Sequence, residues 1–267
     1  MIVDAFLFYN ELNIVELRLE TLKDKVDWFV LVRGDRTHRG DLIDSPDLDE
    51  AVLALTKHFN LHACTVILPP DVPSPWDREH IQRDAMADAI QVSLAPPPET
   101  TVLLSDADEI PDPARLDEAV RITRRGEVAC FQQVHSYFAL NLVDEEVWYG
   151  SRAISWGQLC HTTAQALRDV SNPGNQTVVT NGGWHFGWTG GNAEIRKKLK
   201  AFAHEELDRP DLMSDDRLNA CLEQKITLHN GHNLFPVDIA WMPKHVRENR
   251  AKYEAMLVPT DRVSGGA

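Results

Sequence analysis

Residues 101–111 read TVLLSDADEIP, and this stretch decides the fold. Its first four residues are apolar or β-branched, which predicts a buried strand. The acidic residues that follow would lie at the carboxyl end of that strand, where open α/β sheets bind ligands. Because side chains at positions i and i+2 of an extended segment point to the same side, we expect Asp106 and Asp108 to face one site.

An acidic pair of this kind indicates a divalent cation and a nucleotide-diphosphate site. Carboxylate oxygens suit Mg²⁺ or Mn²⁺, whose remaining positions are filled by water and substrate phosphates. A third acid, Glu109, follows, and Pro111 is typical of the first turn of a helix. Clustered carboxylates repel one another unless a cation is present. An isolated Asp-x-Asp is also compatible with a polar strand end or a helix cap.

Size and charge limit the class of protein. A length of 267 residues with 43% hydrophobic content allows one large α/β domain. We expect a single domain over residues 1–267, with the acidic motif in a half at 1–125 and a second half at 126–262. The formal net charge is −14, from 27 basic and 41 acidic residues, which argues against nucleic acid or an anionic membrane as the main partner.

The sequence also predicts where the protein resides. The amino terminus lacks a basic flank and interrupts its apolar run at Asp4, so it does not resemble a secretory signal. The longest apolar run, residues 28–32, is too short to span a bilayer. The four cysteines lie far apart, which is typical of reduced thiols rather than of a disulfide framework. We expect a cytoplasmic protein with no membrane span.

The hydrophobic pattern predicts an alternation of strands and helices in the first half. Four strands separated by helices predict a doubly wound, mostly parallel sheet with right-handed crossovers, and the second half has a mixed pattern. The predicted strands cover residues 2–9, 26–32, 64–68, 101–104, 128–137, 148–156 and 182–188, and the predicted helices cover residues 10–22, 47–59, 76–92, 112–124 and 192–204.

Five separated blocks of sequence together resemble glycosyltransferase family 17, over roughly residues 2–204. Five blocks in the same order are far more specific than any one of them. The blocks are DAFLFYNE at 4–11, THRG at 37–40, Arg78-Glu79 with Gln82-Arg83, LSDADEIP at 104–111 and GWHF at 183–186. The family includes the β-1,4-mannosyl-glycoprotein N-acetylglucosaminyltransferase that adds the bisecting sugar.

The resemblance implies a GT-A-type fold and an inverting glycosyltransferase. It implies a nucleotide-sugar donor, by analogy UDP-N-acetylglucosamine, with Mn²⁺ or Mg²⁺ as cofactor and a hydroxyl group of a glycan or small molecule as acceptor. Residues 1–125 then become the nucleotide-sugar and metal half, and residues 126–262 the acceptor half. Asp108 is expected to bind the cation directly, while Asp106 contacts the ribose or binds the metal through water.

Other site residues follow from position and analogy. Many GT-A enzymes complete the metal site with a residue from the second half, so His185 is a candidate third ligand, although a histidine on an apolar strand is also typical of a hydrogen-bonded core residue. Gln82 and Arg83, with Arg78, are expected to reach the nucleotide or its phosphates. The alternative is a surface helix in which Glu79 and Arg83 form an i,i+4 pair.

The first strand and the second half supply the remaining candidates. Asn10 and Glu11 follow the first strand, where they are expected to meet the base or ribose, unless Asn10 only caps a helix. Inversion requires a general base, and Glu194 is the first choice because it follows a glycine-rich aromatic segment. It could instead only stabilise a helix dipole. Its rivals are Asp144, Glu145, Glu146, Glu205 and Glu206.

Two other functions remain open from the sequence. A metal-dependent nucleotidyltransferase also combines a doubly wound sheet with aspartates, but it would normally have a glycine-rich phosphate loop after the first strand, which residues 10–13 do not provide. A carbohydrate-binding protein without catalytic activity is the other alternative, and the intact acidic motif argues against it. Aromatic residues such as Trp148, Trp184 and Trp188 could line an acceptor cleft or lie in the core.

Overall fold

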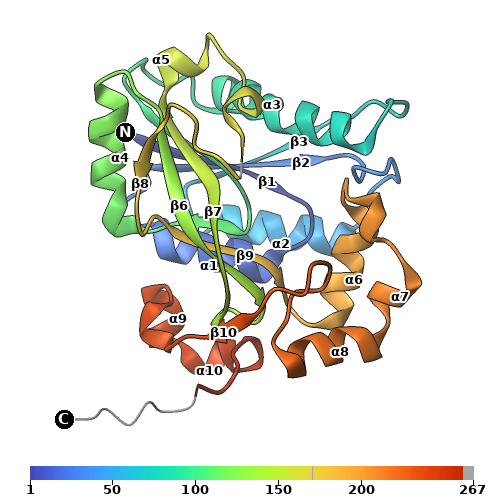
Figure 1. Ribbon diagram of the computed structural model, residues 1–267. Coiled ribbons are helices and arrows are strands. Elements are labelled where there is room, and N and C mark those ends of the chain that lie inside the picture. Colours follow the sequence, from blue (N-terminus) through green and yellow to red (C-terminus); the bar gives the residue numbers. More distant parts are fainter. Residues whose placement is uncertain (170, 261–267) are drawn as a thin grey trace, which may run out of the picture.

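A ten-stranded mixed sheet forms the centre of the computed structural model, which describes residues 1–169 and 171–260 (Figure 1). The strand order is β3-β2-β1-β4-β7-β6-β9-β5, with β10 beside β7 and β8 beside β6. The strands are β1 (Ile2–Phe8), β2 (Trp28–Gly34), β3 (Leu61–Val66), β4 (Thr101–Asp106), β5 (Glu109–Pro111), β6 (Ala129–Phe138), β7 (Leu142–Ser155), β8 (Thr177–Val179), β9 (Gly183–Thr189) and β10 (Leu234–Pro236).

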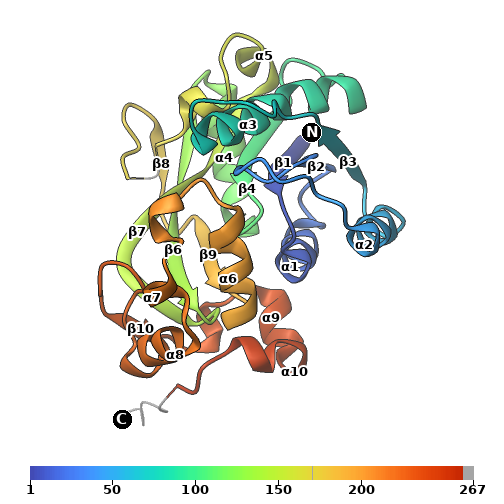
Figure 2. The same cartoon turned by 90° about the vertical axis from the view of Figure 1, so that its right-hand side faces the viewer.

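Helices cover both faces of the first half of the sheet. Figure 2 shows α1 and α2 on one side of strands β1 to β3 and α3 on the other. The α-helices are α1 (Leu12–Leu22), α2 (Pro46–Thr56), α3 (Pro75–Ser93), α4 (Leu116–Arg124), α5 (Trp156–Leu159), α6 (Asn192–Ala201), α7 (Pro210–Met213), α8 (Asp215–Gln224), α9 (Lys244–Glu248) and α10 (Arg250–Tyr253).

Strand β1 illustrates why the first half of the sequence folds this way. Its alternate residues Val3 and Leu7 pack in the same cluster as Ile90 of α3, whereas Phe6 packs in the cluster that contains Val15 of α1. A strand that is buried on both faces needs apolar residues at nearly every position. Strands β1 to β4 are parallel to one another, as the alternating pattern predicts.

The second half of the sheet is mixed, which confirms the predicted fold class. Strand β7 is antiparallel to β4 and to β6, while β9 runs parallel to β6. The sheet is continuous across the predicted division at residue 125, because β4 pairs with β7 and β5 pairs with β9. The predicted end of the second half at residue 262 lies outside the described residues.

Two predicted boundaries were wrong near the acidic motif and on the third strand. Pro111 does not begin a helix but ends the short strand β5, in which it pairs with Gly183 of β9. A Cβ atom on Gly183 would lie 2.1 Å from the carbonyl oxygen of Ile110, so a glycine is needed where these strands meet. The helical turn begins later, at Pro113, after Asp112 accepts a hydrogen bond from the Ala114 amide.

The third strand covers Leu61–Val66 instead of residues 64–68, because its pairing with β2 sets its position more strongly than its own composition does. The other predicted elements appear with ends that differ by a few residues, and β7 begins six residues earlier than the 148–156 segment, at Leu142. Within the described residues, none of the helices has both the length and the apolar character required to cross a bilayer.

Candidate active site

A cavity of about 510 Å³ opens beyond the carboxyl ends of β1 and β4. Tyr9 and Glu11 follow β1, Asp106 and Asp108 follow the apolar part of β4, and Lys198 of α6 lies on the wall contributed by the second half. Ligands bind at this edge of open α/β sheets. The acidic motif therefore faces a cavity large enough for a nucleotide-sized ligand, as the sequence predicted for its location.

Asp106 is the last residue of β4, and its carboxylate is bound by two arginines. It accepts hydrogen bonds from Nη2 of Arg83 on α3 at 3.1 Å and from Nη2 of Arg168 at 2.7 Å. Burial alone would raise the pKa of Asp106, but the charges of Arg168 and Arg83 lower it to about 2. Asp106 is therefore ionised at neutral pH and held by side chains from two distant segments.

Asp108 lies in the turn between β4 and β5 and faces a different cation. Its Oδ2 accepts a hydrogen bond from Nζ of Lys198 at 2.5 Å, and its Oδ1 lies 3.6 Å from Nε2 of His185. Burial opposes ionisation, but the Lys198 and His185 side chains hold the pKa of Asp108 far below its usual range. The chain turns after Asp106, so the two carboxylates have different hydrogen-bond partners, although both line the same cavity.

Lys198 is a buried ammonium group that the sequence analysis missed. Besides Asp108, it donates to the carbonyl oxygen of Gly187 at 2.8 Å and lies 3.8 Å from Oε1 of Glu11. Burial disfavours its charge, but the carboxylates of Asp108 and Glu11 raise its pKa above the usual value. The lysine-rich composition of residues 192–204 was a signal for a cation here, but it did not identify which lysine is buried.

Glu109 organises the turn from inside the protein. It is fully buried and accepts hydrogen bonds from the Asp106 amide at 3.0 Å, from Nε1 of Trp148 at 2.6 Å and from both Nη atoms of Arg168 at 2.7 Å. A Cβ atom on Gly150 would lie 2.6 Å from this carboxylate, so glycine is required beside it. The third acid of the motif therefore holds Arg168 and Trp148 in place.

Two histidines lie beside Asp108 in a stack of rings. His185 stacks on Trp148 with ring centroids 4.2 Å apart and on His135 of β6 at 4.5 Å. Nδ1 of His185 and Nε2 of His135 are buried and have no hydrogen-bond partner among the described residues. Burial, together with the neighbouring His185, lowers the pKa of His135 to about 2, so its ring is neutral. The sequence analysis did not single out His135, because one histidine on a strand carries no motif.

On α3, both interpretations of the predicted nucleotide-binding residues have structural support. Gln82 and Arg83 line the cavity. Arg83 also donates to Glu79 at 2.8 Å, which is the i,i+4 pair considered as the alternative. Gln82 bonds through Oε1 to Nε2 of His38 at 2.9 Å, which connects α3 to the THRG block.

Arg78 and Asn10 are not among the described residues that line the cavity, whereas Glu11 is. Arg78 donates to the carbonyl oxygens of Pro69 at 2.9 Å and His38 at 2.8 Å, so it holds two loops together. Glu11 precedes α1 and accepts hydrogen bonds from the amides of Asn10 at 3.0 Å and Tyr9 at 3.3 Å. Asn10 therefore does not cap the helix through its side chain.

The acids considered as general base lie in different surroundings. Glu194 begins α6, and its side chain is 50% exposed, with Lys197 as an ion-pair partner at 4.0 Å. Of the six acids considered, all of them in the described part of the chain, only Glu206 lines the cavity. Its Oε1 lies 2.5 Å from Nδ1 of His204, and that histidine packs edge-on against Trp76.

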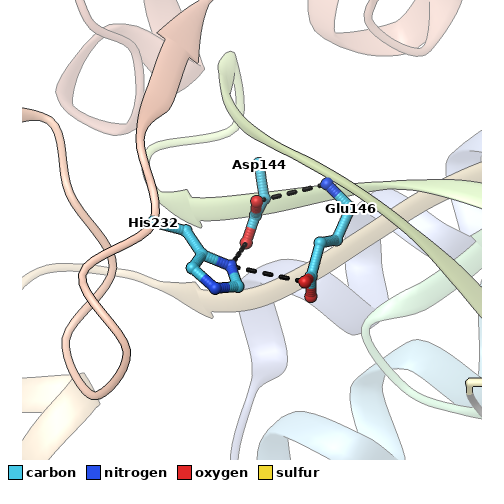
Figure 3. Close-up of side chains that lie close together, drawn as sticks. All are labelled: Asp144, Glu146 and His232. Atoms are coloured by element: carbon cyan, nitrogen blue, oxygen red, sulfur yellow. Dashed lines mark hydrogen bonds and ion pairs between the residues drawn. The ribbon is translucent and has the colours of Figure 1, made fainter.

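A second group of possible metal ligands lies elsewhere (Figure 3). Asp144, Glu146 and His232 offer ligand atoms that all lie within 4.8 Å of one another. Nδ1 of His232 is 3.5 Å from Glu146 and 3.9 Å from Asp144, and the Glu146 amide donates to Asp144 at 3.2 Å. These three residues, which we call the β7 cluster, are not among the described residues that line the cavity.

Asp108 and His185 each offer one ligand atom to a divalent cation, while Lys198 binds the other oxygen of Asp108. An aspartate oxygen and an imidazole nitrogen face each other at 3.6 Å, which is close to the separation of two ligands that share one metal ion. A buried unpartnered nitrogen of His135 lies in the same wall. Asp106 fits a direct ligand less well, because Arg83 and Arg168 already bind its two oxygens.

The fold is mixed α/β, and the cavity opens at the carboxyl edge of the sheet, which is where open α/β sheets bind ligands. The sequence model of glycosyltransferase family 17 matches residues 1–237. The chain therefore belongs to glycosyltransferase family 17 and is a glycosyltransferase, which confirms the resemblance found in the sequence. A search of curated proteins gave no match.

Several solved structures match part of this chain at low similarity. Mannose-6-phosphate isomerase from Helicobacter pylori has 12% identity and a TM-score of 0.35, with 58% of this chain and 71% of that chain covered. A mannosyltransferase from Pyrobaculum calidifontis in complex with GDP-Man and Mn²⁺ has 15% identity and a TM-score of 0.35, covering 60% and 46%. A 4-diphosphocytidyl-2C-methyl-D-erythritol synthase has 10% identity and a TM-score of 0.37, covering 68% and 88%.

Proposed function

We propose that this glycosyltransferase transfers a sugar, with inversion, from a nucleoside-diphosphate sugar to a hydroxyl group of a glycan or small molecule. By the family resemblance the donor is UDP-N-acetylglucosamine. The observation that carries the proposal is the position of Asp106 and Asp108 at the cavity beyond β4, in a chain that matches the family over residues 1–237.

The charges of the cavity support an anionic donor. Arg83, Arg168 and Lys198 line it, although the whole chain has a net charge of −14. Lysine and arginine are the side chains that bind phosphate groups most effectively. The diphosphate of the donor would therefore lie against these three cations, with Gln82 and Glu11 close to the nucleoside.

Asp108 and His185 would hold the divalent cation, Mn²⁺ or Mg²⁺. When bound, the cation neutralises the charge that develops on the departing nucleoside diphosphate. The chain itself prepares this site: Glu109 fixes the turn through the Asp106 amide, and Lys198 keeps Asp108 ionised in a buried environment. Asp106 would hold Arg83 and Arg168 beside the leaving group, and its contact to the ribose or, through water, to the metal stays a prediction.

The general base would accept the proton of the attacking hydroxyl group. Glu194 and Glu206 are the two candidates that we retain, and the cavity geometry favours Glu206. A base must lie within hydrogen-bond reach of the proton that it removes. Glu206 faces the cavity, whereas Glu194 would need α6 or the acceptor to bring it there.

The test begins with donor binding. We expect only true donors among UDP-, GDP- and CMP-sugars to raise the melting temperature of the full chain in a concentration-dependent way, more strongly with Mn²⁺ than without it. Transfer or hydrolysis of the labelled donor then checks activity. Asp108→Asn should lose the Mn²⁺-dependent part of the shift, while Asp117→Asn, a change at an exposed surface acid, should retain it.

Two outcomes would contradict the proposal. One is the absence of any shift or turnover with all nucleotide sugars tested. The other is the release of pyrophosphate from a nucleoside triphosphate and a sugar phosphate, because that reaction belongs to a nucleotidyltransferase.

A further inference from the structure

We infer that Arg18 is a positioning residue of the proposed active site. Its guanidinium, held by Asp4, binds the backbone of the turn between β4 and β5 and thereby sets where Asp106 and Asp108 lie. Neither Arg18 nor Asp4 is among the described residues that line the cavity, so the pair acts through the turn. The inference rests on the proposed function, because it assigns the two acids to donor and cation binding.

The first observation is a buried ion pair between β1 and α1. The side chains of Asp4 and Arg18 are both fully buried. The two oxygens of Asp4 accept hydrogen bonds from Nε of Arg18 at 2.7 Å and from Nη2 at 2.6 Å. Two parallel bonds of this kind fix the plane of a guanidinium group. Asp4 therefore determines the direction in which the third nitrogen of Arg18 points.

The second observation is that this third nitrogen faces the backbone of the acidic turn. Nη1 of Arg18 donates to the carbonyl oxygen of Glu109 at 2.7 Å and to that of Asp106 at 3.1 Å, and the carbonyl oxygen of Ala107 lies 3.4 Å away. Buried carbonyl groups need a hydrogen-bond donor. Because these oxygens belong to one short turn and meet at one nitrogen, Arg18 fixes how the chain reverses direction.

The third observation is that the turn is also held from other sides. Oε2 of Glu109 accepts a hydrogen bond from the Asp106 amide at 3.0 Å, and the carbonyl oxygen of Asp108 accepts one from the Phe186 amide at 2.8 Å. The side chains of Asp106 and Asp108 face the cavity. A shift of the guanidinium would therefore move both carboxylates, and a misplacement of about 1 Å in an active site can lower the rate about a hundredfold.

Stability alone does not account for the pair. Asp4 interrupts the apolar run of β1, and Arg18 lies on the buried face of α1 together with Val15 and Leu22. A buried ion pair is often no more stabilising than two well-packed apolar residues of similar size. Apolar residues, however, could not donate hydrogen bonds to the carbonyl groups of the turn, which gives the pair a role that they could not fill.

The first experiment measures the turn directly, without a ligand. Arg18→Lys keeps the positive charge but lacks the planar fork of donors, and Asp4→Asn is a milder change that leaves Arg18 in place. Leu22→Ala is the matched control, because Leu22 is a fully buried residue of the same helix that has no polar group to bind the turn. Amide hydrogen exchange of the full-length protein, followed by mass spectrometry, compares residues 105–110 with residues 28–34 of β2.

Both changes in the ion pair should accelerate exchange of residues 105–110, relative to β2, at least about tenfold, whereas Leu22→Ala should not change this ratio. Asp4→Asn keeps the inference testable if Arg18→Lys does not fold. Exchange of residues 105–110 that follows the control in every folded variant would overturn the inference.

The second experiment measures turnover of UDP-N-acetylglucosamine with Mn²⁺ at a temperature where all variants are folded. We expect Arg18→Lys to lower kcat at least about tenfold and Leu22→Ala to stay within about twofold of the wild type. Wild-type kcat in folded Arg18→Lys would overturn the positioning role and leave the proposed function in place. If the wild type turns over none of the nucleotide sugars, the proposed function fails, and the exchange measurement still decides whether Arg18 fixes the turn.

Discussion

The molecule contains two groups of acids that could attract a cation, and they differ in burial and pairing. In the turn that follows β4, Glu109 is fully buried, and Asp106 and Asp108 are bound by arginine or lysine side chains. In the β7 cluster, Asp144 is buried but Glu146 is 64% exposed, and the basic side chain beside both is the imidazole of His232. Acids lie close together in both groups, but among the described residues only the first group lines the cavity of about 510 Å³.

The comparison teaches that burial and opposite charge mark a functional cluster better than spacing does. Burying a charge costs free energy unless the charge is paired, so clusters of buried charges are found mainly at functional sites. An exposed acid keeps its hydration, so its presence on the surface does not by itself indicate a function.

Asp108→Asn should lower the turnover of donor at saturation by about a thousandfold, because it removes the carboxylate that would hold the cation that neutralises the leaving group. It should also lower the melting temperature, since Lys198 would remain buried without its carboxylate. Steady-state kinetics and thermal unfolding measure the two effects. Asp144→Asn in the β7 cluster is the control, and a comparable loss in that variant would remove the functional difference between the clusters.

Glu109→Gln should reduce the free energy of unfolding by about 3 kcal/mol, because it weakens the charge-assisted hydrogen bonds of the buried Arg168 guanidinium, which keeps Asp106 as its other carboxylate partner. Glu146→Gln should change it by less than about 0.5 kcal/mol, as is usual for exposed positions. Denaturant unfolding followed by circular dichroism gives both values. Equal effects in the two variants would show that burial does not separate the clusters.

Glu206→Gln should lower kcat by about a hundredfold with little change in donor binding, because the proposed base could no longer accept a proton. Glu194→Gln should retain nearly all activity, because Glu194 is not among the described residues that line the cavity. Kinetics with a fixed acceptor and a donor-binding assay distinguish the two steps. The reverse result would assign the base to Glu194, as the sequence first suggested.

Gly150→Ala should cost about 1–3 kcal/mol of stability, because the new methyl group would meet the Glu109 carboxylate and Oε1 of Gln133 at 2.6 and 2.5 Å. The free energy of unfolding measures this effect. A variant as stable as the wild type would mean that Glu109 has room to move and is not the rigid centre of the turn.

Part of this site could be predicted from the sequence alone. Sequence analysis identified the strand before the acidic motif, the cavity position of Asp106 and Asp108, and the proximity of His185 to Asp108. It did not find Arg168, which binds Asp106 from 62 positions away in a segment without a motif. It also placed a helix at Pro111, because three residues of edge strand are too short to produce a periodic pattern.

The sequence by itself determined the parallel half of the sheet and the place of the acids at its edge. Continuous apolar runs can only be buried on both faces, and a polar cluster must then follow where the strand leaves the core. Only the tertiary structure decided which cation each acid meets, that His135 comes beside His185, and that Glu109 lies inside. These contacts join segments far apart in the chain, and no local pattern encodes them because they form only when β4, β6, β7, β9 and α6 pack together.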